Sequence, residues 1–230
     1  AASNASSNWK RLAPLRCFAD RALCSRFSAF HRMVNSIILW ASGKFHDVAM
    51  NTSTVTPQLT FGDTVGNDGI WTQHLNRVQG TGLRPTLFLD RDGVILVETH
   101  YLHTVEDTRL MPGAATCIRR ANELEVPVVV VTNQSGIGRG IYGWAEFAAV
   151  QEKMLDDLAT EDAFVNAVMA CPFHDTAEPP WNIPNHPDRK PEPGMLLRAG
   201  AMIPIDYSAS WIVGDHASDL QAGKAAGLHG

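Results

Sequence analysis

The stretch Thr86-Leu-Phe-Leu-Asp-Arg-Asp-Gly-Val94 decides the fold of this chain. Residues 86–90 are an apolar run that predicts a short buried strand, and the run ends on two carboxylates, Asp90 and Asp92. Burying a carboxylate is costly unless a partner compensates its charge. In an α/β sheet ligands bind at the carboxyl ends of strands, where a divalent cation could pair with both acids. Asp-x-Asp-Gly is also ordinary turn chemistry, so this stretch alone leaves a metal site and a turn equally open.

Further apolar runs follow at regular intervals along the chain. Runs rich in β-branched residues at 126–132, 164–171 and 210–215 predict three more strands. Helical patterns separate and follow them, opening at Pro112 and covering 144–159, 193–202 and 217–226. Alternating strands and helices predict an α/β fold with a doubly wound, Rossmann-like parallel sheet and right-handed crossovers.

The first part of the chain has a different composition from the rest. Residues 1–50 are rich in Ser and Ala and carry seven Lys/Arg against two acidic residues. They resemble an organellar transit peptide, but a disordered tail, or residues upstream of a true start at Met33 or Met50, would look the same. We favour a start at Met50. Residues 51–82 read as a polar lead-in segment with one short structured piece at 69–72, and 83–230 as the functional domain.

Composition excludes several classes of protein. A net charge of -5 and a pI near 6.0 argue against a general nucleic-acid binder. Four scattered cysteines do not form a disulfide framework, which fits a reducing compartment. No apolar run reaches the ~18 residues that a membrane span needs. We therefore expect a soluble, cytoplasmic, monomeric protein without a nucleic-acid or membrane partner.

The groups that follow the other predicted strands suit a phosphate and a metal ion. They are Thr132, Asn133 and Gln134 after the second run, Arg189 and Lys190 after the third, and Asp215 and Asp219 after the fourth. Hydroxyl, amide and backbone N–H groups bind phosphate oxygens, and a second acidic pair completes a cation site. Each group alone could equally be a helix cap or a solvated surface pair. Their joint position at four strand ends favours a single site.

These motifs resemble the haloacid dehalogenase-like hydrolases. Asp90-x-Asp92-Gly-Val matches the first motif of that superfamily, Thr132 the second, Lys190 the third and Gly214-Asp215-x-x-x-Asp219 the fourth. Phe-Leu-Asp-Arg-Asp-Gly, Val-Thr-Asn-Gln-Ser-Gly-Ile-Gly-Arg-Gly and Arg-Lys-Pro-Glu-Pro-Gly-Met are similar to its histidinol-phosphatase and heptose-bisphosphate phosphatase branch. The resemblance covers residues 86–228.

The resemblance implies a role for each of these residues. Asp90 would attack phosphorus and form an aspartyl-phosphate, while Asp92 would protonate the leaving oxygen and then deprotonate water. Asp90, the backbone carbonyl of Asp92, and Asp215 would hold Mg²⁺. Thr132 and Lys190 would bind the equatorial phosphate oxygens.

Secondary roles and the substrate class follow from the same resemblance. Asn133, Gln134 and Arg189 would contact the rest of the substrate, and Asp219 would orient the loop or a metal-bound water. His216 stands where many branch members have Lys. The function implied is a Mg²⁺-dependent phosphatase acting on a small sugar phosphate or bisphosphate. The alternatives are a histidinol-phosphate phosphatase and a phospholigand-binding protein without activity.

The loop between the third predicted strand and Arg189 raises the question of a second metal. The heptose enzymes carry a structural zinc loop there, with three cysteines and a histidine. This chain offers Cys171, His174, His186 and Asp188, a set that could still bind zinc. The alternative is a metal-free loop braced by prolines, and we favour it.

The lengths of two connections and the position of the C-terminus bear on the shape of the domain. Residues 93–111 and 172–188 are too short for a separate cap domain, so we expect an open site shaped by loops. The family continues beyond the position of Leu228 with another strand and helix. We therefore expect the domain at 83–230 to be truncated at its C-terminus.

Overall fold

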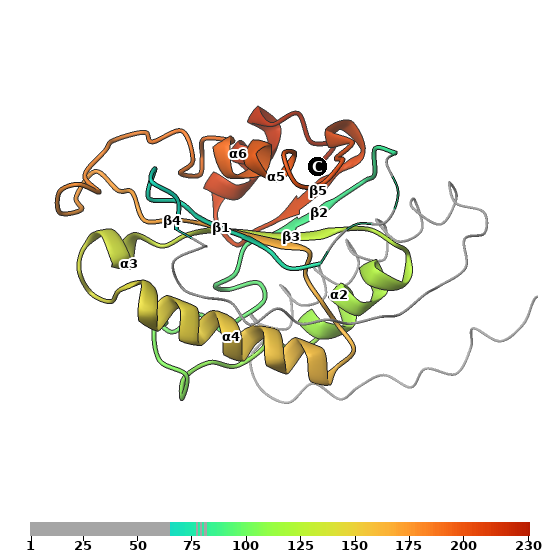
Figure 1. Ribbon diagram of the computed structural model, residues 1–230, viewed down its shortest axis with the longest axis horizontal. Coiled ribbons are helices and arrows are strands. Elements are labelled where there is room, and N and C mark those ends of the chain that lie inside the picture. Colours follow the sequence, from blue (N-terminus) through green and yellow to red (C-terminus); the bar gives the residue numbers. More distant parts are fainter. Residues whose placement is uncertain (1–64, 77, 79, 81) are drawn as a thin grey trace, which may run out of the picture.

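The computed structural model describes residues 65–230 except 77, 79 and 81, and it is organised around one five-stranded sheet (Figure 1). The strand order is β1-β4-β3-β2-β5. The strands are β1 (Trp71–His74), β2 (Leu87–Leu89), β3 (Val128–Asn133), β4 (Ala167–Cys171) and β5 (Trp211–Val213). Strands β4, β3, β2 and β5 run parallel, whereas β1 runs antiparallel to β4. The sheet is therefore mixed, with a parallel centre and an antiparallel edge.

Helices cover both faces of this sheet. They are α2 (Ala114–Glu123), α3 (Ser135–Gly138), α4 (Trp144–Thr160), α5 (Gly194–Ala199) and α6 (Ala217–Ala225), with a short 3-10 turn at Tyr207–Ala209. Figure 1 shows α2 and α4 on one side of the sheet and α5 and α6 on the other. This three-layer arrangement confirms the α/β, doubly wound fold that the alternating pattern predicts.

Side chains of the central strands alternate between two hydrophobic clusters. In β2, Leu87 and Leu89 belong to the cluster beneath α2 and α4, which includes Phe147 of α4. Phe88, between them, belongs to the opposite cluster, together with Met195 of α5. All three residues of β2 are buried, as expected for a strand covered on both faces. Strand β2 is thereby fixed in the middle of the molecule, with its carboxyl end leading into Asp90.

The four predicted strands are all present, with shifted ends. The third begins at Ala167, three residues later than the run suggested, and the side-chain Oδ1 of the preceding Asn166 accepts a hydrogen bond from the backbone N–H of Val128. The fourth ends at Val213, where the chain turns into the loop that leads to α6. The four predicted helical segments correspond to α2, α4, α5 and α6.

The lead-in segment contributes an edge strand. Strand β1 begins at Trp71, inside the piece of structure that we expected near 69–72, and Trp71 pairs with Ala170 of β4. The Trp71 ring stacks on Trp144 at 5.6 Å between centroids and meets Phe147 edge-on at 5.1 Å. The strand thus extends the core over the start of α4.

Neither insert forms a domain of its own. No helix or strand lies between β2 and α2, where only isolated bridges such as Leu96 with Leu110 occur, nor between β4 and α5. The expectation of a protein without a large cap is confirmed. Our expectations for residues 1–50, and for 51–64, lie outside the described residues. Among the described helices, none combines the length and apolar character that a membrane crossing requires.

Candidate active site

Asp90 lies at the point where β2 leaves the sheet. Its backbone N–H donates to the carbonyl of Val213 at 2.9 Å, so the end of β2 is fixed against the end of β5. One side-chain oxygen, Oδ1, accepts the backbone N–H of Arg91 at 2.7 Å. The Asp90 residue is buried, with 8% of its surface exposed. The sheet therefore holds this carboxylate in a fixed place with little access to bulk water.

A buried lysine links two of the carboxylates. Lys190 Nζ lies 3.1 Å from Oδ2 of Asp90 and 2.5 Å from Oδ1 of Asp219. It also donates to the carbonyl of Val131 at 2.7 Å. Asp219 is wholly buried, and its Oδ2 accepts the backbone N–H of His216 at the start of α6. Full burial excludes a role for Asp219 on the helix surface, and its carboxylate both caps α6 and neutralises Lys190.

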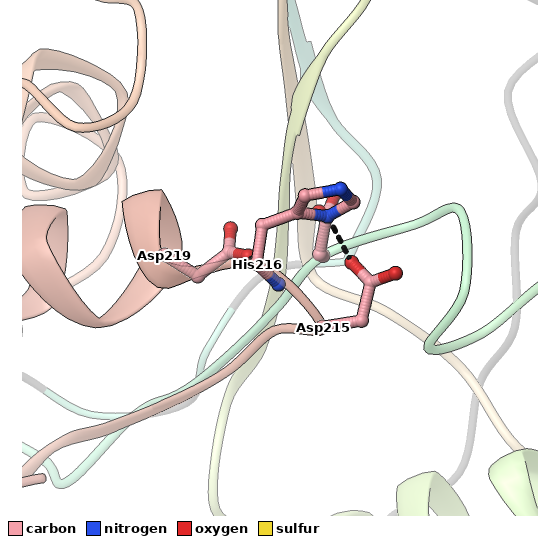
Figure 2. A group of neighbouring side chains, drawn as sticks. Asp215, His216 and Asp219 are labelled. Atoms are coloured by element: carbon pink, nitrogen blue, oxygen red, sulfur yellow. Dashed lines mark hydrogen bonds and ion pairs between the residues drawn. The ribbon is translucent and has the colours of Figure 1, made fainter.

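Four side chains form the group suited to a cation. Ligand atoms of Asp90, Asp215, His216 and Asp219 all lie within 4.8 Å of one another. Figure 2 shows Asp215 and His216 on the loop before α6 and Asp219 in its first turn, with Nδ1 of His216 hydrogen-bonded to Oδ1 of Asp215 at 2.6 Å. Carboxylate oxygens are the ligands that Mg²⁺ prefers, so the donor set fits this ion. The side chain of Asp92 is outside the group, consistent with a contribution through its backbone carbonyl.

The titration of these groups reflects burial and crowding of like charges. Burial raises the pKa of Asp90 to about 6; Lys190 opposes this rise, while Asp219 and Asp92 add to it. Burial lowers the pKa of Lys190, but Asp90 and Asp219 outweigh this effect and the pKa is raised. The hydrogen bond and charge of Asp215 raise the pKa of His216. The site thus has an excess of negative charge that a bound cation would neutralise.

Asp92 is held by two neighbours. Arg91 donates from Nε to Oδ1 of Asp92 and from Nη2 to Oδ2, both at 2.9 Å. Nε2 of Gln134 donates to Oδ2 at 2.8 Å and to the hydroxyl oxygen of Thr132 at 2.9 Å. Tyr142 donates its hydroxyl to Oε1 of Gln134 at 2.5 Å. Asp92 therefore belongs to a connected polar network behind the cation group.

The residues after β3 take different positions around the site. Thr132 is buried beside Gln134, which orients Asp92. Asn133 uses its side-chain amide on the backbone of Lys190, donating to the carbonyl at 2.9 Å and accepting the N–H at 3.1 Å. In this structure the side chains of Asn133 and Gln134, which we expected to contact substrate, bind neighbouring protein groups.

A positively charged rim lies beside the loop after β4. Nη2 of Arg139 lies 3.0 Å from a ring nitrogen of His174, and Nη1 of Arg139 donates to the hydroxyl of Tyr101 at 2.5 Å. Nη1 of Arg189 donates to the carbonyl of Phe173. Burial, Arg189 and Arg139 together lower the pKa of His174. We call Arg139, His174 and Arg189 the basic rim.

The four candidate zinc ligands do not gather. The only group of potential ligands found among the described residues is the one around Asp90 and Asp215. Asp188 is instead bound by Arg198, with Nη2 to Oδ2 at 2.8 Å, and the His186 ring stacks on Phe173 at 3.8 Å. Burial raises the pKa of the Cys171 thiol to about 12, away from the thiolate that zinc requires. The donor set does not fit zinc.

The sequence did not reveal three residues of this site. Arg91 stands between two acids and Arg139 lies in the glycine-rich stretch after Thr132, and neither has a predicted role of its own; Tyr142 lies outside the recognised motifs. A signal was present for Arg91, since an arginine directly after a buried apolar run must find a partner when it is buried as well. Which partner it finds depends on the turn after β2, and only the structure shows that.

The comparisons with known proteins agree with this geometry. The family of haloacid dehalogenase-like hydrolases matches residues 35–227, and the chain belongs to this family. Within it the chain is 47% identical, over 160 residues, to a D-glycero-beta-D-manno-heptose-1,7-bisphosphate 7-phosphatase of Mesorhizobium japonicum, covering 70% of this chain and 74% of the relative. The enzyme of that name from Escherichia coli K12 is 38% identical over 63% of this chain and 75% of its own length.

Two solved structures share the fold. One, from Mesorhizobium loti and described as a HAD-like phosphatase, superposes with a TM-score of 0.69 at 45% identity, covering 72% of this chain and 79% of the other. The other is the D,D-heptose 1,7-bisphosphate phosphatase of B. bronchiseptica complexed with magnesium and phosphate, with a TM-score of 0.55 at 32% identity, covering 62% and 77%. The predicted enzyme class, a phosphatase of the haloacid dehalogenase type, is confirmed.

Proposed function

We propose that this chain is a Mg²⁺-dependent phosphatase that removes one phosphate from a sugar bisphosphate of the heptose 1,7-bisphosphate type. The observation that carries the proposal is the cation group, in which ligand atoms of four residues lie within 4.8 Å of one another around the buried Asp90. Relatives of which this chain matches more than two thirds of the length are named as heptose-bisphosphate phosphatases. A related structure binds magnesium and phosphate.

The reaction divides between two carboxylates. An oxygen of Asp90 attacks phosphorus, and the bond from phosphorus to the sugar oxygen breaks with its electron pair going to that oxygen. The sugar oxygen takes a proton from Asp92, leaving an aspartyl-phosphate on Asp90. Water then attacks this phosphorus and gives its proton to Asp92, which releases inorganic phosphate and regenerates both side chains.

The remaining groups bind and neutralise charge. Asp90, Asp215 and the backbone carbonyl of Asp92 would hold Mg²⁺, with Asp219 in support, and the ion supplies positive charge beside the transferring phosphoryl group. Lys190 and the hydroxyl of Thr132 bind the equatorial phosphate oxygens. Lys190 is suited to this because its ammonium is held in place by Asp90 and Asp219 on the protein side.

The basic rim is the best support for a substrate with a second anionic group. Arg139, His174 and Arg189 come from two different loops, and they influence each other's charge. The positive charges of Arg139 and Arg189 repel each other and add to burial in lowering the pKa of His174, so an anion bound beside the two arginines is favourable. Arg189 also precedes Lys190 directly in the chain, and we infer that the part of the substrate away from the reacting phosphate binds at the rim.

The test is phosphate release from a panel of substrates with and without Mg²⁺. The panel contains heptose 1,7-bisphosphate, fructose 1,6-bisphosphate, a sugar monophosphate and histidinol phosphate. We expect the highest kcat/KM for the heptose bisphosphate and no release by Asp90→Asn. Equal release by wild type and Asp90→Asn would exclude Asp90 as nucleophile. Preference for histidinol phosphate, or binding without turnover, would support one of the two alternative functions instead.

A further inference from the structure

Arg91 is, with Asp219, one of two fully buried charged residues of the site. Its residue exposure is 0%, and its guanidinium carbon lies 4.9 Å from the centroid of the Phe147 ring in α4. Phe147 in turn packs edge-on against Trp71 of the edge strand β1. Burial lowers the pKa of Arg91, but the charge and hydrogen bonds of Asp92, together with the charges of Tyr142 and Asp90, outweigh this and the pKa is raised. The guanidinium is therefore a charged group clamped between α4 and the site.

This one residue contacts both reacting carboxylates. Its backbone N–H donates to Oδ1 of Asp90 at 2.7 Å. Its side chain grips Asp92 with two parallel hydrogen bonds, from Nε to Oδ1 and from Nη2 to Oδ2. A two-point contact of this kind fixes the plane of a carboxylate as well as its position.

Counting the acceptor sites of Asp92 shows where a substrate can approach. A carboxylate offers about four lone-pair sites, two on each oxygen. Oδ2 accepts from both Arg91 and Gln134, whereas Oδ1 accepts, among the donors of the described residues, only the Nε–H of Arg91. One site on Oδ1 thus remains for a group outside the network. The Asp92 side chain is 19% exposed, so this remaining site is accessible.

The arrangement is poor as a device for stability alone. Nη1 of Arg91 is buried and finds no hydrogen-bond acceptor among the described residues. Leaving a buried charged donor unpaired is costly, and an apolar residue would avoid that cost. The buried Nη1, unpaired among the described residues, therefore destabilises the fold, while the two hydrogen bonds to Asp92 fix the orientation of that side chain. This combination is typical of a functional rather than a purely structural residue.

We propose that Arg91 is a positioning residue that locks the carboxylate of Asp92 so that Oδ1 alone exchanges a proton with the substrate. The inference rests on the proposed function, in which Asp92 carries the proton to the leaving oxygen. Arg91 itself neither touches substrate nor transfers a proton. Phe147 holds the guanidinium from behind, and Gln134 completes the lock on Oδ2.

The first measurement is structural and does not depend on turnover. Crystal structures of the wild type, Arg91→Met and Arg91→Lys are compared at the Asp92 side chain. The Met side chain fills the space of Arg91 but has no hydrogen-bond donor. The Lys side chain keeps the positive charge but cannot bind both oxygens of Asp92 in parallel. If Arg91→Met does not fold, Arg91→Lys provides the test. We expect Asp92 to leave its orientation in both variants while Asp90 stays in place. An unchanged Asp92 in a folded variant overturns the proposal, even if the protein proves inactive on every phosphate ester.

The second measurement separates positioning from general damage by the choice of leaving group. Fructose 1,6-bisphosphate must receive a proton as its alkoxide leaves, whereas the phenolate of 4-nitrophenyl phosphate leaves without one. We expect Arg91→Met to slow the first half-reaction, measured as release of the leaving group in a single turnover, about 100-fold on the sugar and less than about tenfold on the aryl ester, with KM within about twofold. Hydrolysis of the aspartyl-phosphate, in which Asp92 takes the proton of water, should slow equally after either ester. Asp92→Asn should show the same selectivity. Arg120→Met, on the exposed face of α2, should lose nothing on either substrate.

Equal losses in the first half-reaction on both esters in a folded Arg91→Met would mean that Arg91 supports the whole site, which overturns the proposal. Absence of any loss would overturn it as well. If the wild type hydrolyses neither ester, the proposed function fails, and the crystal structures still decide whether Arg91 orients Asp92. The two failures are therefore distinguishable.

Discussion

Asp90 is a buried carboxyl group whose pKa is raised by the fold. Burial raises its pKa from 3.8 to about 6, so in the metal-free protein the folded state retains a proton that the unfolded chain has lost. A raised acid pKa gives a stability contribution that is complete below pH 3.8 and is lost as pH rises through about 6. The buried charge is tolerated at neutral pH because Lys190, and in the working enzyme a cation, neutralise it.

The first prediction concerns this charge. Without divalent cations, raising the pH from 4.5 to 8 should destabilise the wild type relative to Asp90→Asn by roughly 2 kcal/mol. The reason is that Asn cannot ionise. Urea unfolding in chelator at several pH values measures the difference. Asp156→Asn, on the exposed face of α4, is the control and should follow the wild type at every pH. Parallel curves for wild type and Asp90→Asn would refute the prediction.

A glycine beside Asp90 provides the second prediction. Gly93 has a φ of +78°, and a Cβ added there would lie 2.5 Å from Oδ2 of Asp215. Gly227 has nearly the same φ, +79°, but a Cβ there would meet nothing within 4 Å. Both Ala variants should lose about 1 kcal/mol from backbone strain. Only Gly93→Ala should also displace Asp215 and weaken Mg²⁺ binding, at least tenfold by calorimetry, and equal Mg²⁺ affinity in the two variants would contradict this.

Much of the site follows from residue type and position alone. Asp90, Lys190, Asp215 and Asp219 could be placed together because each follows a predicted strand, and parallel strands end at one edge. The sequence does not predict in which direction the side chain of Arg91 points. Neighbours along a strand point to opposite faces, yet the turn after β2 brings the side chains of Arg91 and Asp92 together.

At the scale of elements, β1 links the lead-in segment to the core. Its alternation places Trp71 and Gln73 inward, with His74 exposed. Trp71 is 3% exposed and packs on Trp144 and Phe147, so it supports the residue that lies against the Arg91 guanidinium. An edge strand of four residues thus contributes to a site from which it is separated by a helix.

The third prediction removes this support. Trp71→Ala should lower the free energy of unfolding by about 3 kcal/mol because a large buried ring leaves a cavity. His74→Ala, on the same strand but exposed, should change it by no more than about 0.5 kcal/mol. Urea denaturation at neutral pH measures both. Similar small effects for the two variants would show that β1 packs only loosely on α4.

The elements differ in how far the sequence predicts them. Strands β2, β3, β4 and β5 are apolar because both of their faces are covered, and this produces continuous runs that are easy to recognise. Strand β1 is at an edge, and its mixed polar sequence has no such run. Its antiparallel direction depends on pairing with β4, whose partner residues lie almost a hundred positions later, and no local pattern encodes that contact.

At the scale of the whole molecule, side-chain contacts tie the loop after β4 to the rest of the protein. Arg198 binds Asp188 within that loop and also Asp68 from the segment before β1, at 2.8 Å each. Phe173 packs between His186 and Trp181. These contacts connect the loop to the lead-in segment without any ion.

The fourth prediction concerns metal content. Purified protein should contain no stoichiometric zinc, and chelator should abolish phosphate release while leaving the folded state intact. Adding Mg²⁺ at ten times its Kd should restore activity and raise the free energy of unfolding by about 1.4 kcal/mol. Elemental analysis and thermal melts test this. Unfolding by chelator, rescued only by zinc, would contradict it.

The pairing of β2 with β5 affects when the site can form during synthesis of the chain. Thr86 at the start of β2 bonds to Ser210 at the start of β5 across 124 residues of sequence. Closing so long a loop is entropically costly and tends to occur late in folding. A chain emerging from the ribosome therefore carries Asp90 long before Asp215 exists beside it. The growing chain stays without its cation group until β5 docks, so activity begins only after β5 and the loop that carries Asp215 have been synthesised and packed against β2.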